Sequence, residues 1–195
     1  MSRTTSMLMG LLVVLIPVSL NAQERMLFQF DSPDDVRPWR SVNDGVMGGR
    51  SSGKVSYDSD GAMDFSGYLS LENNGGFASI RAAKPNMGLK ANDVIFARVR
   101  GDGRKYTFNV YAQENLRGRS YRQTFPTTKD KWTLVAFPVN QFAATWRGRN
   151  FPNDRLDPAQ AAGLGILLGI KSRDPSIWRL IGSRSLVQAS ENRST

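Results

Sequence analysis

The segment DVIFARVRGDGRKYTFNVYAQ at residues 93–113 places two alternating runs on either side of a glycine-containing turn. In the first run, Ile95, Ala97 and Val99 share one face, and in the second run Tyr106 and Phe108 begin another apolar face. Successive side chains of a strand point to opposite faces, so a period of two is typical of a strand that is buried on one side. The stretch therefore predicts two β-strands, each with one face in a core.

The turn between the two runs predicts how they pair. Gly101-Asp102-Gly103 is a tight glycine turn, and two alternating runs around such a turn favour an antiparallel hairpin. The outer face of this hairpin, extended by the next expected strand at residues 121–125, predicts a basic and partly aromatic binding surface made of Arg98, Arg100, Asn109, Tyr111 and Arg122. Arginine can make bidentate contacts to carboxylate or phosphate, and tyrosine offers a stacking surface. The alternative is a solvated face whose charges only keep the protein in solution.

Outward from this hairpin, the chain reads as short strand-like runs separated by Gly, Asn, Asp and Pro clusters. Strands at this spacing predict an all-β sandwich or barrel instead of alternating β and α units. One short helix is expected after Asp157, because Asp is a good N-cap, Pro158 suits the first helical position and Gln160 completes a capping box. Gly163 would end it.

The first 22 residues have the pattern of a secretory signal peptide. Arg3 precedes an apolar run at residues 7–16, and a small residue, Ala22, stands before Gln23. The apolar run is shorter than the ~20 residues that a membrane-spanning helix needs. We therefore expect cleavage before Gln23, a periplasmic or secreted protein of 173 residues (195 − 22), and no membrane span.

The net charge of the chain limits the classes of binding partner that it favours. The formal net charge is +9, which favours anionic partners through long-range attraction. Export makes nucleic acid a poor candidate, so an anionic glycan, lipid headgroups or an acidic protein surface fit better. A basic solvated surface with no specific partner stays open as the alternative.

The composition also disfavours catalysis. The chain has no histidine and no cysteine, which removes the usual neutral-pH base and the thiolate nucleophile. Most acidic residues sit in turn-like clusters, where backbone hydrogen bonds explain them. We expect no enzymatic activity, no catalytic residue, no cofactor and no metal site. Asp58-Ser59-Asp60-Gly61 resembles the start of a calcium loop but has no distal glutamate, so a plain turn is favoured there and a structural calcium stays open.

Two glycine-rich blocks are the most specific feature of the chain: WRSVNDGVMGGRS at residues 39–51 and FSGYLSLENNGGFASIR at residues 65–81. They resemble the complex I intermediate-associated protein 30 family. The resemblance covers nearly all of the mature chain and weakens near residues 171–185. It implies a galactose-binding-like jelly-roll β-sandwich over residues 23–189, akin to family 11 carbohydrate-binding modules. A disordered tail is expected at residues 190–195.

Most residues of the first block, residues 39–51, are expected to have a structural role. Glycine supplies positive φ and close backbone approach, so a structural role is expected for Trp39, Asn43, Asp44, Gly45, Gly48 and Gly49. Asn43 and Asp44 nevertheless remain a second candidate for ligand contact.

Two functions follow as hypotheses. The resemblance implies a protein-binding assembly factor or chaperone-like module. Export would separate it from the peripheral arm of complex I, so its partner is expected in the cell envelope. The alternative is a carbohydrate-binding module that uses the concave sheet face, for which the candidate aromatic platforms are Tyr111, Tyr121 and Trp146.

Overall fold

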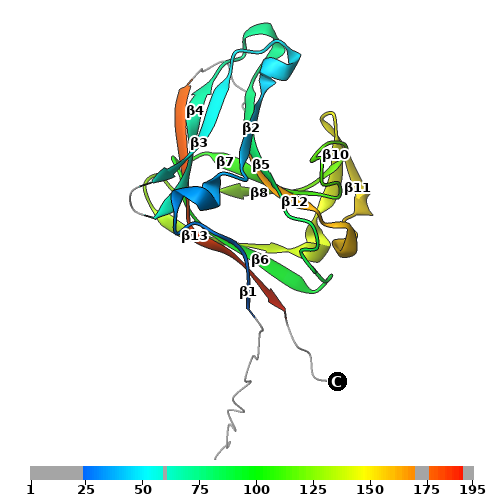
Figure 1. Cartoon of the computed structure of the whole chain (residues 1–195). Coiled ribbons are helices and arrows are strands. Elements are labelled where there is room, and N and C mark those ends of the chain that lie inside the picture. The colour runs from blue at the N-terminus through cyan, green and yellow to red at the C-terminus, as the bar shows by residue number, and fades with distance from the viewer. Residues whose placement is uncertain (1–23, 59–60, 170–175, 191–195) are drawn as a thin grey trace, which may run out of the picture.

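The chain folds into a sandwich of two antiparallel β-sheets (Figure 1). The structure is a computed structural model that describes residues 24–58, 61–169 and 176–190. The predicted signal peptide at residues 1–22 lies outside the described residues. Of the predicted tail, Ser190 ends the last strand, and residues 191–195 lie outside the described part as well.

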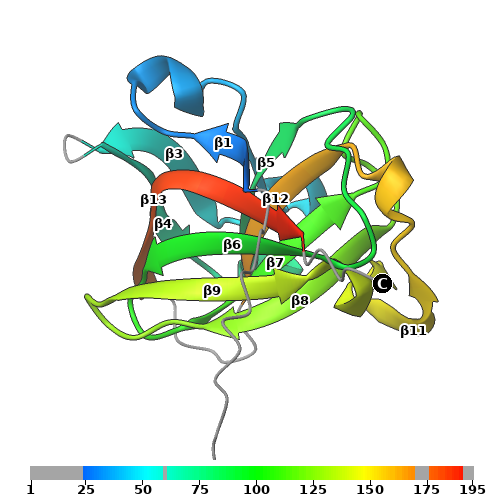
Figure 2. The same cartoon turned by 90° about the horizontal axis from the view of Figure 1, so that it is seen from below.

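The first sheet has six strands. Its order is β3 (Ser52–Asp58), β4 (Ala62–Leu69), β13 (Ser176–Ser190), β6 (Asp93–Arg100) and β9 (Trp132–Pro138), with β1 (Arg25–Gln29) also paired to β13. Figure 2 shows β13, β6 and β9 side by side in this layer.

The second sheet has seven strands and includes the central strand β7. Its order is β11 (Arg149–Arg155), β10 (Ala143–Trp146), β8 (Ser120–Pro126), β7 (Lys105–Tyr111), β12 (Gly163–Gly169), β5 (Phe77–Ala83) and β2 (Arg40–Asn43). Every pair of strands in both sheets is antiparallel. The all-β sandwich predicted from the sequence is therefore confirmed.

The predicted hairpin at residues 93–113 is wrong. β6 pairs with β13 and β9 in the first sheet, whereas β7 pairs with β8 and β12 in the second. The turn at residues 101–103 therefore carries the chain from one sheet to the other. The Thr127 hydroxyl holds this crossing, since it accepts from the Gly103 amide at 3.1 Å and donates to the Arg104 carbonyl at 2.9 Å.

The physical reason lies in the apolar faces themselves. The predicted core residues of both runs are indeed buried, among them Ile95, Val99, Tyr106 and Phe108. In a sandwich, two strands can bury their apolar faces in one core from opposite sides. The alternation therefore predicts the buried faces correctly, whereas the glycine turn does not predict the strand pairing.

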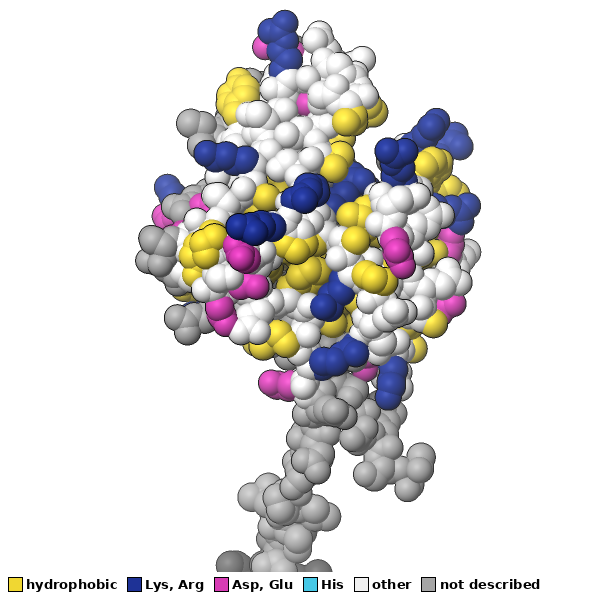
Figure 3. All heavy atoms as spheres, in the orientation of Figure 1, with side chains coloured by type: hydrophobic (Ala, Val, Ile, Leu, Met, Phe, Trp, Pro, Cys, Tyr) yellow, Lys and Arg dark blue, Asp and Glu magenta, His cyan; other side chains and the backbone are white. Residues whose placement is uncertain are grey.

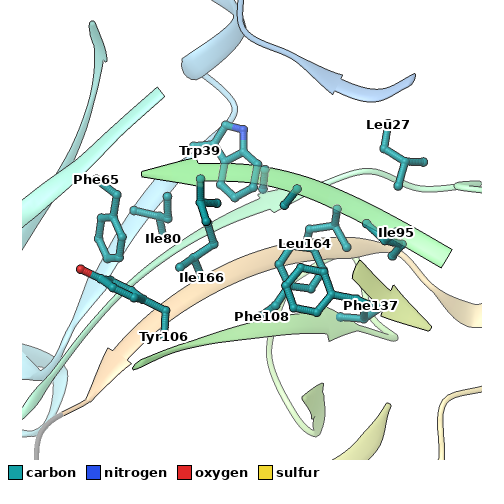
Figure 4. Close-up of a cluster of buried hydrophobic side chains, with 14 of the residues drawn as sticks. Leu27, Trp39, Phe65, Ile80, Ile95, Tyr106, Phe108, Phe137, Leu164 and Ile166 are labelled. Atoms are coloured by element: carbon teal, nitrogen blue, oxygen red, sulfur yellow. The ribbon is translucent and has the colours of Figure 1, made fainter. Parts of the chain in front are cut away.

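The core between the sheets is aromatic and aliphatic (Figure 4). Phe108 of the second sheet stacks on Phe137 of the first, with ring centroids 4.4 Å apart. Trp39, which lies just before β2, is buried against Phe28 and Phe30. Burial of such side chains stabilises the fold by about 2 kcal/mol each.

Short 3₁₀ turns replace the single predicted helix. One of them, η5 (Pro158–Gln160), lies where that helix was expected, and the Asp157 carboxylate accepts from the Ala159 amide at 3.1 Å as an N-cap. The other four in the described residues are η1 (Pro33–Val36), η2 (Asp44–Met47), η3 (Glu72–Asn74) and η4 (Val139–Gln141). Among these described helices, none has the length and apolar character needed to cross a bilayer.

Candidate functional site

The glycine-rich blocks converge on one carboxylate, that of Asp44. Asp44 begins η2, and its side chain is completely buried. Its oxygens accept from the amides of Ser51 at 2.8 Å, Gly76 at 2.6 Å and Phe77 at 3.2 Å. Burial by itself would raise the pKa of Asp44, but the hydrogen bonds from Ser51, Gly76 and Phe77 together hold that pKa below its usual value. Asp44 therefore joins three separate segments of the chain.

The surrounding residues are shaped for this arrangement. A Cβ on Gly75 would lie 2.7 Å from an Asp44 carboxylate oxygen and 2.7 Å from the Ser70 carbonyl oxygen. Gly48 has a φ of +87°, which favours glycine. The Asn43 amide donates to the Gly53 carbonyl at 3.1 Å. These contacts support a structural role for Asn43 and Asp44, and the buried Asp44 carboxylate is not open to a ligand.

The five residues predicted as one binding surface lie on two different sheets. Arg98 and Arg100 are on the outer face of the first sheet, where their guanidinium carbons lie 4.8 and 5.2 Å from the ring centroid of Trp132. Asn109, Tyr111 and Arg122 belong to the second sheet, and Asn109 and Tyr111 are buried. The predicted single surface is therefore wrong, because the chain crosses between the sheets at residues 101–103.

The second sheet nevertheless carries a basic row that the sequence did not reveal. Directly paired residues of antiparallel strands share one face. Across the sheet, one register row runs Arg40, Arg81, Gly165, Asn109, Arg122 and Ala143, and it reaches Arg155 beyond a bulge in the β10–β11 pairing. Ile80 and Ala82 point into the core, so Arg81 between them lies on the outer face. We call Arg40, Arg81 and Arg122 the arginine row.

Among the residues that the structure describes, no acidic side chain forms an ion pair with the arginine row. Within the described residues, the ion pairs are Arg37–Asp34, Arg50–Glu72, Arg104–Asp102 and Arg119–Asp154. Arg40 instead donates to the Arg37 carbonyl. Figure 3 shows basic side chains spread over much of the face in view, so basic character alone does not single out the row. Arg40 is exposed, whereas Arg81 and Arg122 are half-buried, and within the described residues neither of these two has a carboxylate partner.

Tyr111 lies among these arginines. The Arg81 guanidinium carbon is 5.1 Å from the centroid of the Tyr111 ring. Burial raises the pKa of Tyr111, whereas the charges of Arg81 and Arg122 oppose this rise. Burial also lowers the pKa of Arg122; Tyr111 opposes this, and the like charge of Arg81 adds to it. The three side chains therefore share one electrostatic environment.

Two glycines and one loop shape the surroundings of Tyr111. A Cβ on Gly165 would lie 3.0 Å from the edge of the Tyr111 ring, so glycine leaves room for the ring to lie over the sheet. A side chain on Gly163 would collide with Leu116 of the β7–β8 loop. The Leu116 carbonyl in turn accepts from Arg81 at 2.9 Å, so this loop holds Arg81 in place.

A second feature is an aromatic hollow at the end of the same sheet. Its volume is about 460 Å³, and its lining includes Tyr121, Trp146, Gln113, Arg119 and Gln160. Trp146 is 39% exposed. Burial raises the pKa of Tyr121, and Asp154 raises it further. Of the three aromatic residues predicted as platforms, the structure brings Tyr121 and Trp146 together and buries Tyr111 elsewhere.

Sequence reasoning missed Arg40, Arg81 and the hollow. The alternation around Ile80 does place Arg81 on an outer face, and this was the available signal. Its proximity to Arg122 depends on the order β5–β12–β7–β8, which no local pattern contains.

The comparisons with known proteins agree with this fold. The family model described as Complex I intermediate-associated protein 30 matches residues 28–180. The solved structures similar to this chain include a family 11 carbohydrate-binding module from Clostridium thermocellum in complex with a β-1,3-1,4-mixed-linked tetrasaccharide. The two share 15% identity over 86% of this chain and 95% of that module, with a TM-score of 0.61.

An agarase, AgWH50C, is similar over 86% of this chain but only 24% of its own length, with 12% identity and a TM-score of 0.59. A comparison with curated protein sequences finds no match. The structural likenesses support the predicted galactose-binding-like sandwich.

Proposed function

The chain belongs to the complex I intermediate-associated protein 30 family, and from this premise we propose that it is a non-catalytic module that binds a protein partner through the arginine row. The observation that carries the proposal is the pair Arg81 and Arg122, which are half-buried and have no carboxylate partner among the described residues. Charges withdrawn from water in this way favour an anionic partner.

The dimensions of the sheet suit a protein surface. Neighbouring strands are separated by ~4.8 Å, so six intervals across seven strands span about 29 Å. Stable protein interfaces bury roughly 800 Å² on each partner, an area that a face of this width can supply. The family name, which refers to an assembly intermediate, supports a protein partner. An acidic surface patch or an acidic segment of an assembling protein would complement the row.

If the chain is exported, its protein partner must lie in the same compartment. The charged, apolar and small-residue order of residues 1–22 supports cleavage before Gln23, so the partner would be an envelope or extracellular protein. The intact mass of the exported product tests this part separately. A product that retains residues 7–16 would contradict it.

The main test is affinity capture from an envelope extract with three proteins: wild type, Arg81→Gln/Arg122→Gln and Arg98→Gln/Arg100→Gln. The last is a matched control, because it removes the same charge from the other sheet. We expect discrete proteins on the wild type and the control, released by salt because salt screens exposed charges, and their loss from the Arg81/Arg122 variant. Equal capture by all three proteins would contradict the proposal.

A second candidate function is glycan binding in the aromatic hollow. Tyr121 and Trp146 offer ring faces, and Gln113, Arg119 and Gln160 supply polar groups around them, a combination that suits sugar rings. The likeness to a carbohydrate-binding module adds support for this candidate. A glycan array probed with wild type and Trp146→Ala tests it. Binding that is lost on Trp146→Ala and kept on Arg81→Gln/Arg122→Gln would assign the glycan to the hollow, whereas a blank array would exclude this candidate.

A further inference from the structure

Arg81 and Arg122 lie on the two sides of Tyr111 in the second sheet: the Arg81 guanidinium carbon is 5.1 Å from the centroid of the Tyr111 ring, and Arg122 donates to Ser120, the residue that pairs with Tyr111. We call these three residues, Arg81, Tyr111 and Arg122, the cluster. We propose that this cluster is an oxyanion site that takes one carboxylate or phosphate group. The inference rests on the proposed function, because it names the chemical group by which a partner would be held there.

The donors of the cluster are fixed and only partly used. Arg81 donates to the Leu116 carbonyl at 2.9 Å through one terminal nitrogen, while its buried Nε has no hydrogen-bond partner. Arg122 donates from Nε to the Ser120 hydroxyl at 2.8 Å, and within the described part of the chain its terminal nitrogens make no hydrogen bond. The Arg81 Nε is buried and cannot reach an external ligand, but a guanidinium carries five N–H groups, so each arginine keeps terminal N–H groups for an external acceptor.

The position of both side chains is set before a ligand arrives. The Arg81 guanidinium lies on the Tyr111 ring, and Gly165 leaves the space that this ring occupies. The bond to Ser120 restrains Arg122. A site whose donors are already oriented loses less conformational entropy on binding.

The charges of Arg81 and Arg122 indicate that the ligand is an anion. Burial lowers the pKa of Arg122, and Arg81 contributes to this effect as a like charge. Two cations that destabilise each other in a partly dehydrated place are both stabilised by an anion between them. Paired N–H groups of guanidinium match the oxygens of carboxylate and phosphate.

Another arginine of the chain shows how a partly buried guanidinium is neutralised internally. Arg104 is paired with Asp102, and both lie within the described structure. Arg81 and Arg122 are also partly buried, but among the described residues they lack such a carboxylate, which leaves room for an anionic ligand.

The test titrates the protein with sodium phosphate or sodium acetate at constant ionic strength, with sodium chloride as the reference. The arginine Nε–H signals are followed by ¹⁵N NMR. We expect saturable shifts of the Arg81 and Arg122 signals with phosphate, acetate or both, and none with chloride. The anion that binds more tightly identifies phosphate or carboxylate as the preferred group.

Variants locate the site. Arg122→Gln should weaken anion binding at least tenfold, Arg122→Lys should weaken it less because the charge remains, and Arg98→Gln/Arg100→Gln should leave it unchanged. A circular dichroism melt verifies that each variant is folded. Linear shifts of all arginine signals, or binding unaffected by Arg122→Gln, would overturn the oxyanion site.

The oxyanion site and the proposed function can fail independently of each other. If the anion binds but Arg81→Gln/Arg122→Gln still captures the protein partner, the oxyanion site stands and the arginine row does not hold the partner. If the partner is lost while the anion produces no saturable shift, the arginine row holds the partner and the oxyanion site is wrong.

Discussion

Asp44 is a fully buried charge, Arg81 and Arg122 are half-buried charges, and the two groups differ in their internal partners. Asp44 is fully buried and receives three backbone amides from two other segments of the chain. The two arginines are half-buried, repel each other and receive no carboxylate from the described structure. A buried charge whose lone pairs are satisfied by internal donors holds a fold together, whereas half-buried charges that have only neutral internal partners favour an external counter-charge.

The largest expected effect is the loss of the Asp44 carboxylate. Asp44→Ala leaves the amides of Ser51, Gly76 and Phe77 without their acceptor in a buried place, which should lower the free energy of unfolding by about 3 kcal/mol. Urea denaturation measures it. Asp34→Ala is the control, because Asp34 forms only an exposed ion pair with Arg37 and its removal should produce no resolvable change. A loss as small as that of the control would mean that Asp44 does not organise this end of the sandwich.

The next effect separates two glycines of the same blocks. Gly75→Ala places a Cβ 2.7 Å from both an Asp44 oxygen and the Ser70 carbonyl oxygen, whereas a Cβ on Gly45 meets nothing within 4 Å. We expect Gly75→Ala to lower the free energy of unfolding by about 2 kcal/mol through overpacking. Gly45→Ala should be nearly neutral. Equal effects in urea denaturation would show that close approach to Asp44 does not explain the requirement for glycine.

A smaller effect is the dependence of stability on acid. The pKa of Asp44 is lower in the folded protein than its ordinary value of 3.8, so its carboxylate stabilises the fold above that value. This contribution decreases as pH falls below 3.8 and is lost at the folded-state pKa. Melting temperatures between pH 6 and pH 2 should therefore fall less steeply for Asp44→Asn than for wild type. Parallel curves would contradict the assigned hydrogen bonding.

The sequence predicts the buried face of single strands correctly but does not predict pairing between strands that are far apart in the chain. The alternation of β6 and β7 correctly identified Ile95, Val99, Tyr106 and Phe108 as core residues. It could not decide whether the turn at residues 101–103 joins two neighbours in one sheet or crosses between sheets, because both arrangements bury the same side chains. That choice depends on long-range pairing with β8, β9, β12 and β13.

The edge strands were missed for a related reason. β2 is only four residues long and mostly polar, and β11 contains Pro152, which is tolerated at edges but weakens a strand pattern. Since β2 contributes Arg40, missing it hid one end of the arginine row. A structural role for Asp44 was favoured by the glycines next to it in the sequence, but its partners Gly76 and Phe77 lie more than 30 residues away, so the contacts themselves were not predictable.

The smallest expected effect concerns the arginines of the first sheet. Arg98 and Arg100 each already contact an internal partner, the ring of Trp132, at 4.8 and 5.2 Å from its centroid. Arg98→Ser/Arg100→Ser should therefore lower the free energy of unfolding by only about 1 kcal/mol, because each of the two exposed cation–π contacts contributes roughly 0.5 kcal/mol. Partner capture and the anion-dependent NMR shifts should be unchanged. Trp132 fluorescence should respond, which verifies that the contact existed. If the double variant instead loses its partner at low salt, the outer face of the first sheet is the binding surface and the arginine row is not.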